Sequence, residues 1–359
     1  MEALGNVKCV LVAGPDSIRD VIMLSPSLRA LRRALPKARL TLLVSQAGAG
    51  AAALLPGVDE IFVHHAPWQE THGEDAFGPV RDQAVVWELR RRQFDAALIF
   101  ASFVRSPYPT ANMCYRAGIP VRVAQSRECD ESFLTHCVRP PPNTSHQVDR
   151  NLHLLAGLGI PIGGASAMMP RLSPTQEAAT GVDSLLREHG VRGDFVVIAP
   201  DATCGARRYP LARYIDVATR LQQTGHRIVV AGGVADKWAG EALVSAVPGT
   251  VSLCGLTSLS GLVALLRRAQ LLIANDSPFM YLADAVGCPM VILYSGTELE
   301  AHWQPRTTPA RLLRCPTACS PCYRSECPYD RECLAVAPSD VAAEAIGLLG
   351  EGLRAVADG

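Results

Sequence analysis

An aspartate near the N-terminus could carry proton-transfer chemistry. Asp20 follows an apolar run at residues 7–13 and lies in the first turns of the helix expected next. A carboxylate in that position could take a proton from an acceptor hydroxyl group. Asp16 lies nearer to the end of the same run. The helix dipole alone also favours a carboxylate at a helix start, and without further context that structural role is the stronger interpretation.

A basic loop follows a second apolar run, residues 194–199. It contains Thr203, Arg207 and Arg208. Guanidinium groups pair well with phosphate oxygens, and the Thr203 hydroxyl adds another hydrogen-bonding group. The loop therefore indicates an anion site, although an ordinary solvated basic loop explains the same residues about equally well.

A strand-to-helix junction gives a second anion signal. After the apolar run at residues 271–274, Asp276 precedes Ser277, which is a favourable N-cap, and Pro278 suits the first helical position. The free N–H groups at the helix start, those of Phe279 and Met280 among them, would attract a diphosphate. An ordinary capped helix has the same pattern.

A glycine pair ends another apolar run, residues 226–231. Gly232 and Gly233 allow a ligand to approach the backbone closely. Asp236 follows and could accept hydrogen bonds from ribose hydroxyls, as acidic residues do in dinucleotide sites. The alternative is a plain turn with a solvated carboxylate.

Cysteines are concentrated near the end of the chain. Five of the 12 cysteines lie within residues 315–333. Because no export signal precedes them, this cluster suggests a structural zinc or iron site before it suggests disulfides. The predicted ligands are Cys319, Cys322, Cys327 and Cys333. A reduced loop without metal is the alternative, and the scattered cysteines, such as Cys129 and Cys137, are expected to be small buried hydrophobic residues.

Two other groups are weaker candidates. Three arginines in the first half could form a basic acceptor pocket or be ordinary surface residues: Arg105, Arg116 and Arg122. Polar-loop histidines could be ligands or acceptor contacts, but solvated side chains are the better interpretation for His64, His65 and His72, which lie near Trp68.

The elements that would position these residues alternate along the chain. Strands are expected at residues 7–13, 39–44, 60–63, 95–100, 194–199, 226–231, 271–274 and 290–294. Helices are expected at residues 17–35, 47–55, 84–92, 211–224, 259–268 and 338–353, and after Ser277. Alternation of this kind predicts right-handed βαβ units and parallel sheets covered on both faces.

The pattern pauses at residues 162–174, a glycine- and proline-containing stretch that indicates a linker. The prediction is therefore an α/β protein with two Rossmann-like domains, residues 1–170 and 171–359, facing each other across a cleft. The second domain includes the cysteine-rich segment 315–333 and the final helix. Ligands should lie at the carboxyl ends of the strands.

Composition narrows the functional class. Hydrophobic residues make up 48% of the 359, and 34 basic residues balance 34 acidic ones. Bulk charge therefore gives no basis for nucleic-acid binding. No apolar segment reaches membrane-spanning length, and the N-terminus lacks a signal-peptide pattern. We expect a soluble, cytoplasmic protein without a transmembrane segment, with peripheral membrane contact left open.

Taken in order, these segments resemble glycosyltransferase family 9, the bacterial ADP-heptose:lipopolysaccharide heptosyltransferases. Residues 17–32 are similar to the family's N-terminal signature, residues 146–160 to its "H-x-V-x-R…L-G-I" segment, and residues 275–283 to "NDSGPMHLA". The resemblance implies a GT-B fold and inverting transfer of a sugar, commonly heptose from ADP-heptose, to a hydroxyl of a lipopolysaccharide core or another glycan, lipid-linked or protein acceptor. It implies no metal or other cofactor for the chemistry.

The resemblance also implies residue roles. The N-terminal domain would bind the acceptor, with Asp20 as general base, and the C-terminal domain would bind the nucleotide sugar. Arg207 would stabilise the departing diphosphate, where a cation contributes most. Asp276, Ser277 and the helix that follows would hold the donor phosphates, and Asp236 would meet the ribose.

Four positions depart from the family pattern. Arg19, Asp201 and Pro278 replace glycines, and Tyr281 replaces a histidine. Proline cannot donate a hydrogen bond to phosphate, and Asp201 brings a negative charge towards a diphosphate. Two other hypotheses therefore stay open: a catalytically weakened homologue acting as a binding or scaffold protein, and a transferase whose acceptor is a protein or a small metabolite.

Overall fold

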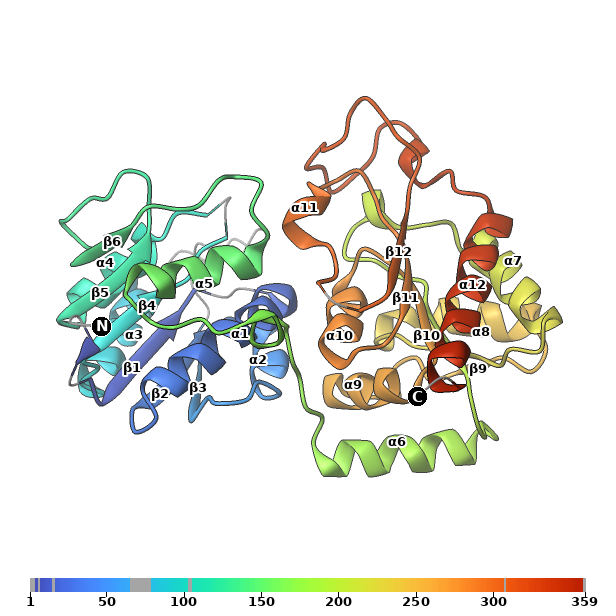
Figure 1. Ribbon diagram of the computed structural model, residues 1–359, viewed down its shortest axis with the longest axis horizontal. Coiled ribbons are helices and arrows are strands. Elements are labelled where there is room, and N and C mark those ends of the chain that lie inside the picture. Colours follow the sequence, from blue (N-terminus) through green and yellow to red (C-terminus); the bar gives the residue numbers. More distant parts are fainter. Residues whose placement is uncertain are drawn as a thin grey trace. The chain divides into compact units, whose positions relative to one another are not determined.

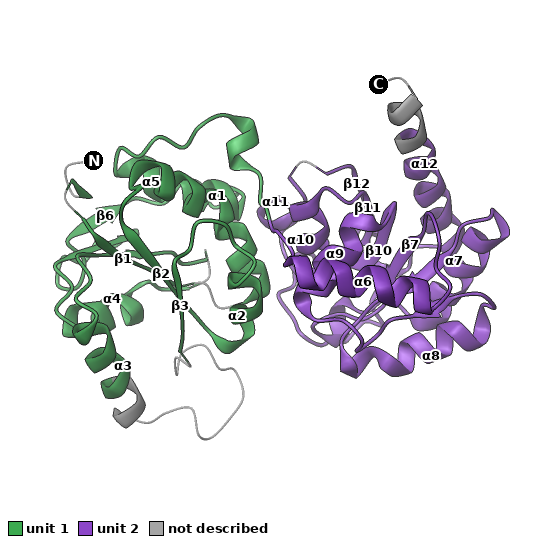
Figure 2. Cartoon of the chain, turned by 90° about the horizontal axis from the view of Figure 1, so that it is seen from below, with its two compact units in different colours: residues 1–171 green, residues 172–359 purple. Residues whose placement is uncertain are grey.

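Two parallel sheets form the framework of the molecule, one in each of two units, Met1–Arg171 and Leu172–Gly359 (Figures 1 and 2). The structure, a computed structural model, describes residues 4–5, 7–14, 17–64, 79–102, 105–306 and 308–357. Within these residues each sheet has six strands.

The sheet of unit 1 has the strand order β3-β2-β1-β4-β5-β6, and neighbouring strands are parallel. Its strands are β1 (Cys9–Ala13), β2 (Arg39–Val44), β3 (Glu60–Val63), β4 (Ala96–Ile99), β5 (Val121–Gln125) and β6 (His136–Val138). The strand order reverses between β1 and β4, which is where open α/β sheets place a ligand.

Helices cover both faces of this sheet (Figure 1). They are α1 (Ile18–Ala34), α2 (Gln46–Ala52), α3 (Pro79–Arg91), α4 (Tyr108–Arg116) and α5 (Gln147–Gly157). Helix α1 packs against α2 and α5, while α3 packs against α4. The central strands are buried on both faces, so they consist of continuous apolar residues rather than alternating ones: four of the five residues of β1 and all four residues of β4 are buried.

Unit 2 repeats the topology with the strand order β12-β11-β10-β7-β8-β9. Its strands are β7 (Val196–Ala199), β8 (Ile228–Val230), β9 (Val251–Ser252), β10 (Leu271–Asn275), β11 (Met290–Leu293) and β12 (Ala310–Leu313). Here the order reverses between β7 and β10. Each unit therefore contains one topological switch point at the carboxyl ends of its two central strands.

The longer helices of unit 2 are α6 (Gln176–Glu188), α7 (Leu211–Gln223), α8 (Lys237–Ala246), α9 (Leu259–Arg268), α10 (Pro278–Val286) and α12 (Pro338–Ala357). A single turn, α11 (Glu300–Trp303), and three short 3-10 helices, η3 (Gly205–Arg207), η4 (Val234–Asp236) and η5 (Glu332–Leu334), lie in the loops. Helix α6 packs on α9, and α12 packs on α7.

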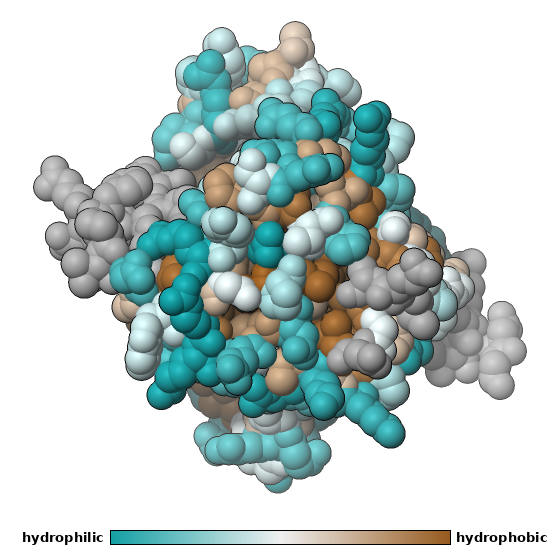
Figure 3. Space-filling model, turned by 90° about the vertical axis from the view of Figure 1, so that its left-hand side faces the viewer, coloured by the Kyte–Doolittle hydropathy of each residue, from teal (hydrophilic) through white to brown (hydrophobic). Residues whose placement is uncertain are grey.

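Surface and core are divided as in other α/β proteins. A core cluster in unit 2 joins β7, β8, β10 and β11 to α7 and α12. On the face of the molecule seen in Figure 3, hydrophilic residues are interspersed with smaller hydrophobic areas. Among the described residues, no helix combines the length and the apolar character needed to span a bilayer.

Candidate active site

The switch point of unit 1 is shaped by Gly14, which follows β1. Its φ is +118°, and a Cβ there would lie 1.8 Å from the carbonyl oxygen of Phe100, which follows β4. Only glycine permits this backbone conformation and this close approach of the two strand ends. The result is a depression at the carboxyl edge of the sheet.

Asp20 lies beside this depression and is held by the start of α1. Ser17 is the N-cap: its Oγ accepts the N–H of Asp20 over 3.2 Å and donates to Asp20 Oδ2 over 2.9 Å. Asp20 Oδ1 is buried and makes no hydrogen bond within the described residues, with Arg19 Nε 3.7 Å away. The carboxylate therefore stabilises the helix start with one oxygen and leaves the other for a further partner.

Asp20 lines a small pocket of about 20 Å³ together with Gly14, Ser102, Arg105, Gln147 and Asn151. Arg105 also lines a larger pocket of about 310 Å³ that contains Arg127 and Arg150. Arg127 donates to Asn143 Oδ1, and burial together with the nearby Arg127 lowers the pKa of Arg150. Three arginines and one carboxylate, Glu128, make this pocket suited to an anion.

The arginines expected to form an acceptor pocket are thus only partly brought together. Arg105 lies in the basic pocket, but Arg122 donates to the backbone carbonyls of Phe133 and Ile119. Arg116 donates to Gln83 Oε1. Of the two alternatives left open for these arginines, the structural role fits Arg116 and Arg122, which support local structure. Sequence reasoning missed Arg127, which no motif distinguishes, and gave no role to Arg150, although Arg150 is the arginine of the "H-x-V-x-R" segment.

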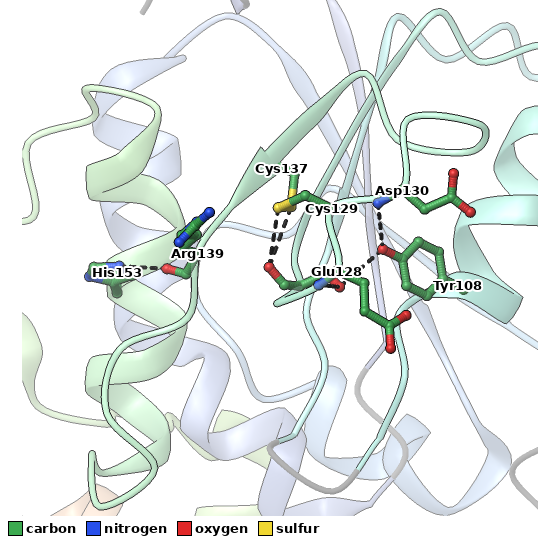
Figure 4. Close-up of a disulfide and its surroundings, with 8 residues drawn as sticks. Tyr108, Glu128, Cys129, Asp130, Cys137, Arg139 and His153 are labelled. Atoms are coloured by element: carbon green, nitrogen blue, oxygen red, sulfur yellow. Dashed lines mark hydrogen bonds between the residues drawn. A yellow bond between two sulfur atoms is a disulfide. The ribbon is translucent and has the colours of Figure 1, made fainter.

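A disulfide beside the basic pocket corrects a second expectation (Figure 4). Cys129 and Cys137 were expected to be reduced, but their Cα atoms lie 5.4 Å apart and their sulfurs are bonded. The bond closes the loop that precedes β6. The Tyr108 hydroxyl also holds this loop, since it donates to Ser126 Oγ over 3.0 Å and accepts the N–H of Asp130 over 2.8 Å.

The switch point of unit 2 is organised by Asn275, the fully buried last residue of β10. Its Nδ2 donates to the carbonyl oxygens of Pro200 over 2.8 Å and Asp201 over 3.0 Å, and its Oδ1 accepts the N–H of Tyr209 over 3.0 Å. Both ends of the loop after β7 are therefore fastened to β10. This brings the basic loop and the start of α10 together, as sequence reasoning expected.

Arg207 points its guanidinium at two carboxylates. Its Nη2 lies 3.0 Å from Glu298 Oε2, and its Nε lies 3.8 Å from Asp276 Oδ2, which also accepts the Ser295 hydroxyl over 2.9 Å. Burial raises the pKa of Asp276 to about 7, although Arg207 and Ser295 act in the opposite direction. Glu298 was not predicted, because nothing in its sequence surroundings marks it.

Ser277 occupies the N-cap position of α10 and Pro278 the first helical position, as expected, but the serine side chain makes no capping bond. Ser277 Oγ and Asp276 Oδ1 are buried and have no hydrogen-bond partner in the part of the chain that the structure describes. Two orphaned polar atoms beside an arginine and a helix N-terminus are what a polar, anionic ligand would satisfy. Phe279 is partly exposed, whereas Met280 is fully buried in the core.

The side chain of Asp236 is hydrogen-bonded within its own turn. Its Oδ2 accepts the N–H of Gly233 over 2.6 Å, and a Cβ at Gly232 would lie 2.6 Å from its side chain. Burial and a hydrogen bond with Asp201 raise the pKa of Asp236. Asp201 in turn accepts Arg208 Nε over 2.6 Å. Arg208 therefore belongs to this second cluster, next to the Arg207 site, and Thr203 is exposed.

The expected metal ligands do not form a metal site. No group of three or more His, Cys, Asp or Glu side chains in the described ranges is arranged to hold a metal ion. The Cys319 thiol is exposed and donates to Thr317, and Cys327 Sγ accepts the backbone N–H groups of Tyr329 and Arg331. Backbone hydrogen bonds to neighbouring loops hold the segment instead.

Several weaker candidates lie outside the described residues: Asp16, His65, Trp68 and His72. His64 is described and follows β3, where its backbone N–H donates to Val44 O over 2.9 Å.

Two Rossmann-like units, each with polar side chains at its switch point, form a GT-B fold, which the solved structures similar to this chain share. The family model for glycosyltransferase family 9 (heptosyltransferase) matches residues 83–332. The chain therefore belongs to glycosyltransferase family 9, as the sequence motifs indicated, and is a glycosyltransferase.

Individual relatives match along almost the whole chain. Lipopolysaccharide heptosyltransferase 2 of Salmonella typhimurium is 25% identical over 95% of this chain and 99% of its own length. The crystal structure of a family 9 glycosyl transferase from Veillonella parvula has a TM-score of 0.78 at 20% identity, covering 96% of this chain and 97% of that one. E. coli ADP-heptose lipopolysaccharide heptosyltransferase II has a TM-score of 0.73 at 20% identity, covering 96% and 99%.

Proposed function

We propose that this protein transfers heptose, with inversion, from ADP-heptose to a hydroxyl of a lipopolysaccharide core acceptor. The proposal rests first on family membership and on the heptosyltransferase 2 relative that matches from end to end. The structural observation that carries it is the Arg207 site, where a partly buried cation, two orphaned polar atoms and a helix N-terminus meet at a switch point. We place the activity in the cytoplasm, with the acceptor presented at a membrane surface.

Unit 2 binds the donor in this proposal. Arg207 pairs with the diphosphate and stabilises the negative charge that develops on the leaving group. The Ser277 hydroxyl and the N–H of Phe279 complete the phosphate contacts, whereas the N–H of Met280 donates to the carbonyl oxygen of Ser277 over 3.1 Å. Asp276 orients Arg207. Thr203 and Arg208 lie at the edge of this site. Asp236 shapes the turn of Gly232 and Gly233 that would face the ribose.

Unit 1 binds the acceptor. The carboxylate oxygen of Asp20 that makes no hydrogen bond takes the proton of the attacking hydroxyl. Arg105 lines both the Asp20 pocket and the basic pocket, so one acceptor can reach Asp20 and place an acidic group near Arg127 and Arg150. No cofactor takes part in these steps, because arginine and the helix N-terminus meet the charge of the diphosphate.

The four departures from the family pattern are compatible with catalysis in this arrangement. Asp201 faces Arg208, so its charge is compensated rather than directed at a diphosphate. Pro278 occupies a position where a missing N–H costs no intrahelical bond. Tyr281 is buried, and Arg19 Nε lies 3.7 Å from Asp20 Oδ1.

A weakened homologue that serves as a scaffold is the second hypothesis, and a transferase for a protein or small-metabolite acceptor is the third. A direct assay separates them: purified protein is incubated with ADP-heptose and a heptose-deficient lipopolysaccharide core, and ADP release is measured with and without the acceptor. Acceptor-dependent release supports the proposal. ADP binding without release from any acceptor supports the scaffold, and release only with a protein or small metabolite supports the third hypothesis.

A structural zinc or iron ion is left out of the proposal, because the described cysteines are not arranged to hold one. Elemental analysis of the purified protein tests this directly. Stoichiometric zinc or iron would restore the sequence-based expectation for Cys319, Cys322, Cys327 and Cys333.

A further inference from the structure

The cysteine segment, residues 315–333, is anchored in the core of unit 2. The N–H of Cys315 donates to the carbonyl oxygen of Cys333 over 2.9 Å, and this bond closes the segment at its base. Cys333 is buried within the core cluster, and Cys315 packs against it. The part between these two residues projects as a loop whose position is fixed at both ends.

This loop holds the turn that carries Arg207. The N–H of Ala206 donates to the carbonyl oxygen of Ser325 over 2.9 Å, and Arg331 Nη1 donates to the carbonyl oxygen of Arg208 over 3.3 Å. A Cβ at Gly205 would lie 2.5 Å from Oε2 of Glu326. The segment is therefore hydrogen-bonded to the backbone of the residue immediately before Arg207 and of the residue immediately after it.

The same loop also holds the strand end that carries Glu298. The N–H of Cys322 donates to the carbonyl oxygen of Gly296 over 2.9 Å, and the N–H of Tyr323 donates to that of Thr297 over 2.8 Å. A Cβ at Gly296 would lie 3.0 Å from the Cβ of Ser320. Two consecutive backbone bonds fix the register between the segment and this loop.

The thiols of the segment influence one another electrostatically. Burial raises the pKa of Cys333, the backbone of Gly296 lowers it, and the thiols of Cys319, Cys322 and Cys327 raise it further.

We propose that the cysteine segment positions Arg207 for the donor diphosphate, by fastening the turn that carries Arg207 and the loop that carries its partner Glu298 to one shared support. The 3.0 Å ion pair between these two side chains depends on the separation of two loops that come from different strands. A phosphate site loses much of its strength when its cation moves by about 1 Å. The inference rests on the proposed function, because it takes Arg207 as the diphosphate-binding residue.

Two substitutions weaken the contacts of the cysteine segment without replacing Arg207 or Glu298. Arg331→Gln removes the guanidinium that binds Arg208 O, and Gly296→Val forces the segment away from Ser320. Each has a matched control in unit 2. Arg227→Gln removes a guanidinium that binds the backbone carbonyls of Gly190 and Arg192. Gly181→Val adds a side chain in α6 where a Cβ meets nothing within 4 Å.

The experiment titrates each purified full-length variant with ADP and with adenosine by calorimetry. Arg331→Gln and Gly296→Val should weaken ADP binding by roughly 5-fold or more, as expected for misplacing one charge-assisted contact, and should leave adenosine binding within about 2-fold. The two controls should bind both molecules as the wild type does. In an Arg207→Ala background, Arg331→Gln should weaken ADP binding no further, because the residue it positions is absent.

Several results would overturn the inference. One is an equal loss of ADP and adenosine binding, which indicates general damage to unit 2. Another is unchanged ADP binding in both loosened variants while Arg207→Ala weakens it. The third is full additivity with Arg207→Ala. If the wild type binds no ADP at all, it is the proposed function that fails, and this outcome is visible before any variant is made.

Discussion

Arg207 Nη2 lies 3.0 Å from Glu298 Oε2, and its Nε lies 3.8 Å from Asp276 Oδ2. Two carboxylates thus hold one arginine at the switch point of unit 2. The two carboxylates position the guanidinium, but they also neutralise its charge. A bound diphosphate must therefore compete with Glu298 for the same guanidinium.

Neutralising Glu298 should tighten donor binding. Glu298→Gln keeps a carbonyl oxygen for Arg207 Nη2 but removes the competing charge, so we expect ADP to bind roughly 3- to 10-fold more tightly. Glu298→Ala, which removes the support as well, should bind ADP less tightly than Glu298→Gln. Calorimetric titration at fixed ionic strength measures both. ADP binding in Glu298→Gln that is no tighter than in the wild type would contradict the competition.

Removing Arg207 should reduce catalysis more than it disturbs folding. Arg207→Ala is expected to lower kcat by about 10²–10³, the usual loss when one donor to a developing charge is removed. Arg207→Lys should recover part of the rate, because it restores charge without the planar fork. Steady-state kinetics with ADP-heptose give the values. An increase in the acceptor KM with an unchanged kcat would show that Arg207 acts elsewhere.

The two roles of Asp20 can be separated. Asp20→Asn should lower kcat by about 10²–10⁴ through loss of the base. Ser17→Ala removes the N-cap and both bonds to Asp20, so it should cost about 1 kcal/mol of stability and leave the base in place. Thermal unfolding and kcat are measured on both variants. The base assignment fails if Asp20→Asn retains wild-type kcat.

Asp276 should make stability fall with pH. Burial raises its pKa to about 7 in the folded chain, above the ordinary value of 3.8, so the folded state binds more protons than the unfolded state between these values. The free energy of unfolding then decreases as pH rises from about 4 to 7. Asp276→Asn, which cannot ionise, should lack this decline, and its stability relative to wild type should be highest above pH 7. Urea unfolding from pH 4 to 8 tests this, and parallel pH profiles would contradict it.

Sequence periodicity predicted much of the framework, because buried parallel strands are continuous apolar runs that few other elements mimic. The bounds of β2 and β3 match the expected residues, and those of β10 and α9 match to within one residue. It did not predict β6 or β12. The former has only three residues, and all four residues of the latter are only partly buried, so neither produces an apolar run.

The candidate site was predicted where chemistry follows from local sequence. The Ser277–Pro278 junction and the basic loop of Arg207 both lie at the switch point, since strand ends position them. Glu298 could not be predicted, because its importance comes from contacts with residues far away in sequence. Arg150 lies in the "H-x-V-x-R" segment, but its place in the basic pocket appears only in three dimensions. The cysteine segment was misread for the same reason: spacing indicates a metal, while its backbone bonds to Ala206 and Gly296 appear only in three dimensions.

The most direct test of the central claim is calorimetric titration of the wild type and Arg207→Ala with ADP, UDP and GDP. The account predicts that the wild type prefers ADP and that Arg207→Ala binds it at least about 10-fold more weakly, as expected for the loss of a charge-assisted phosphate contact. Absence of binding to all three nucleotides, or equal ADP affinity in the two proteins, would contradict the assignment of unit 2 as the donor-binding unit.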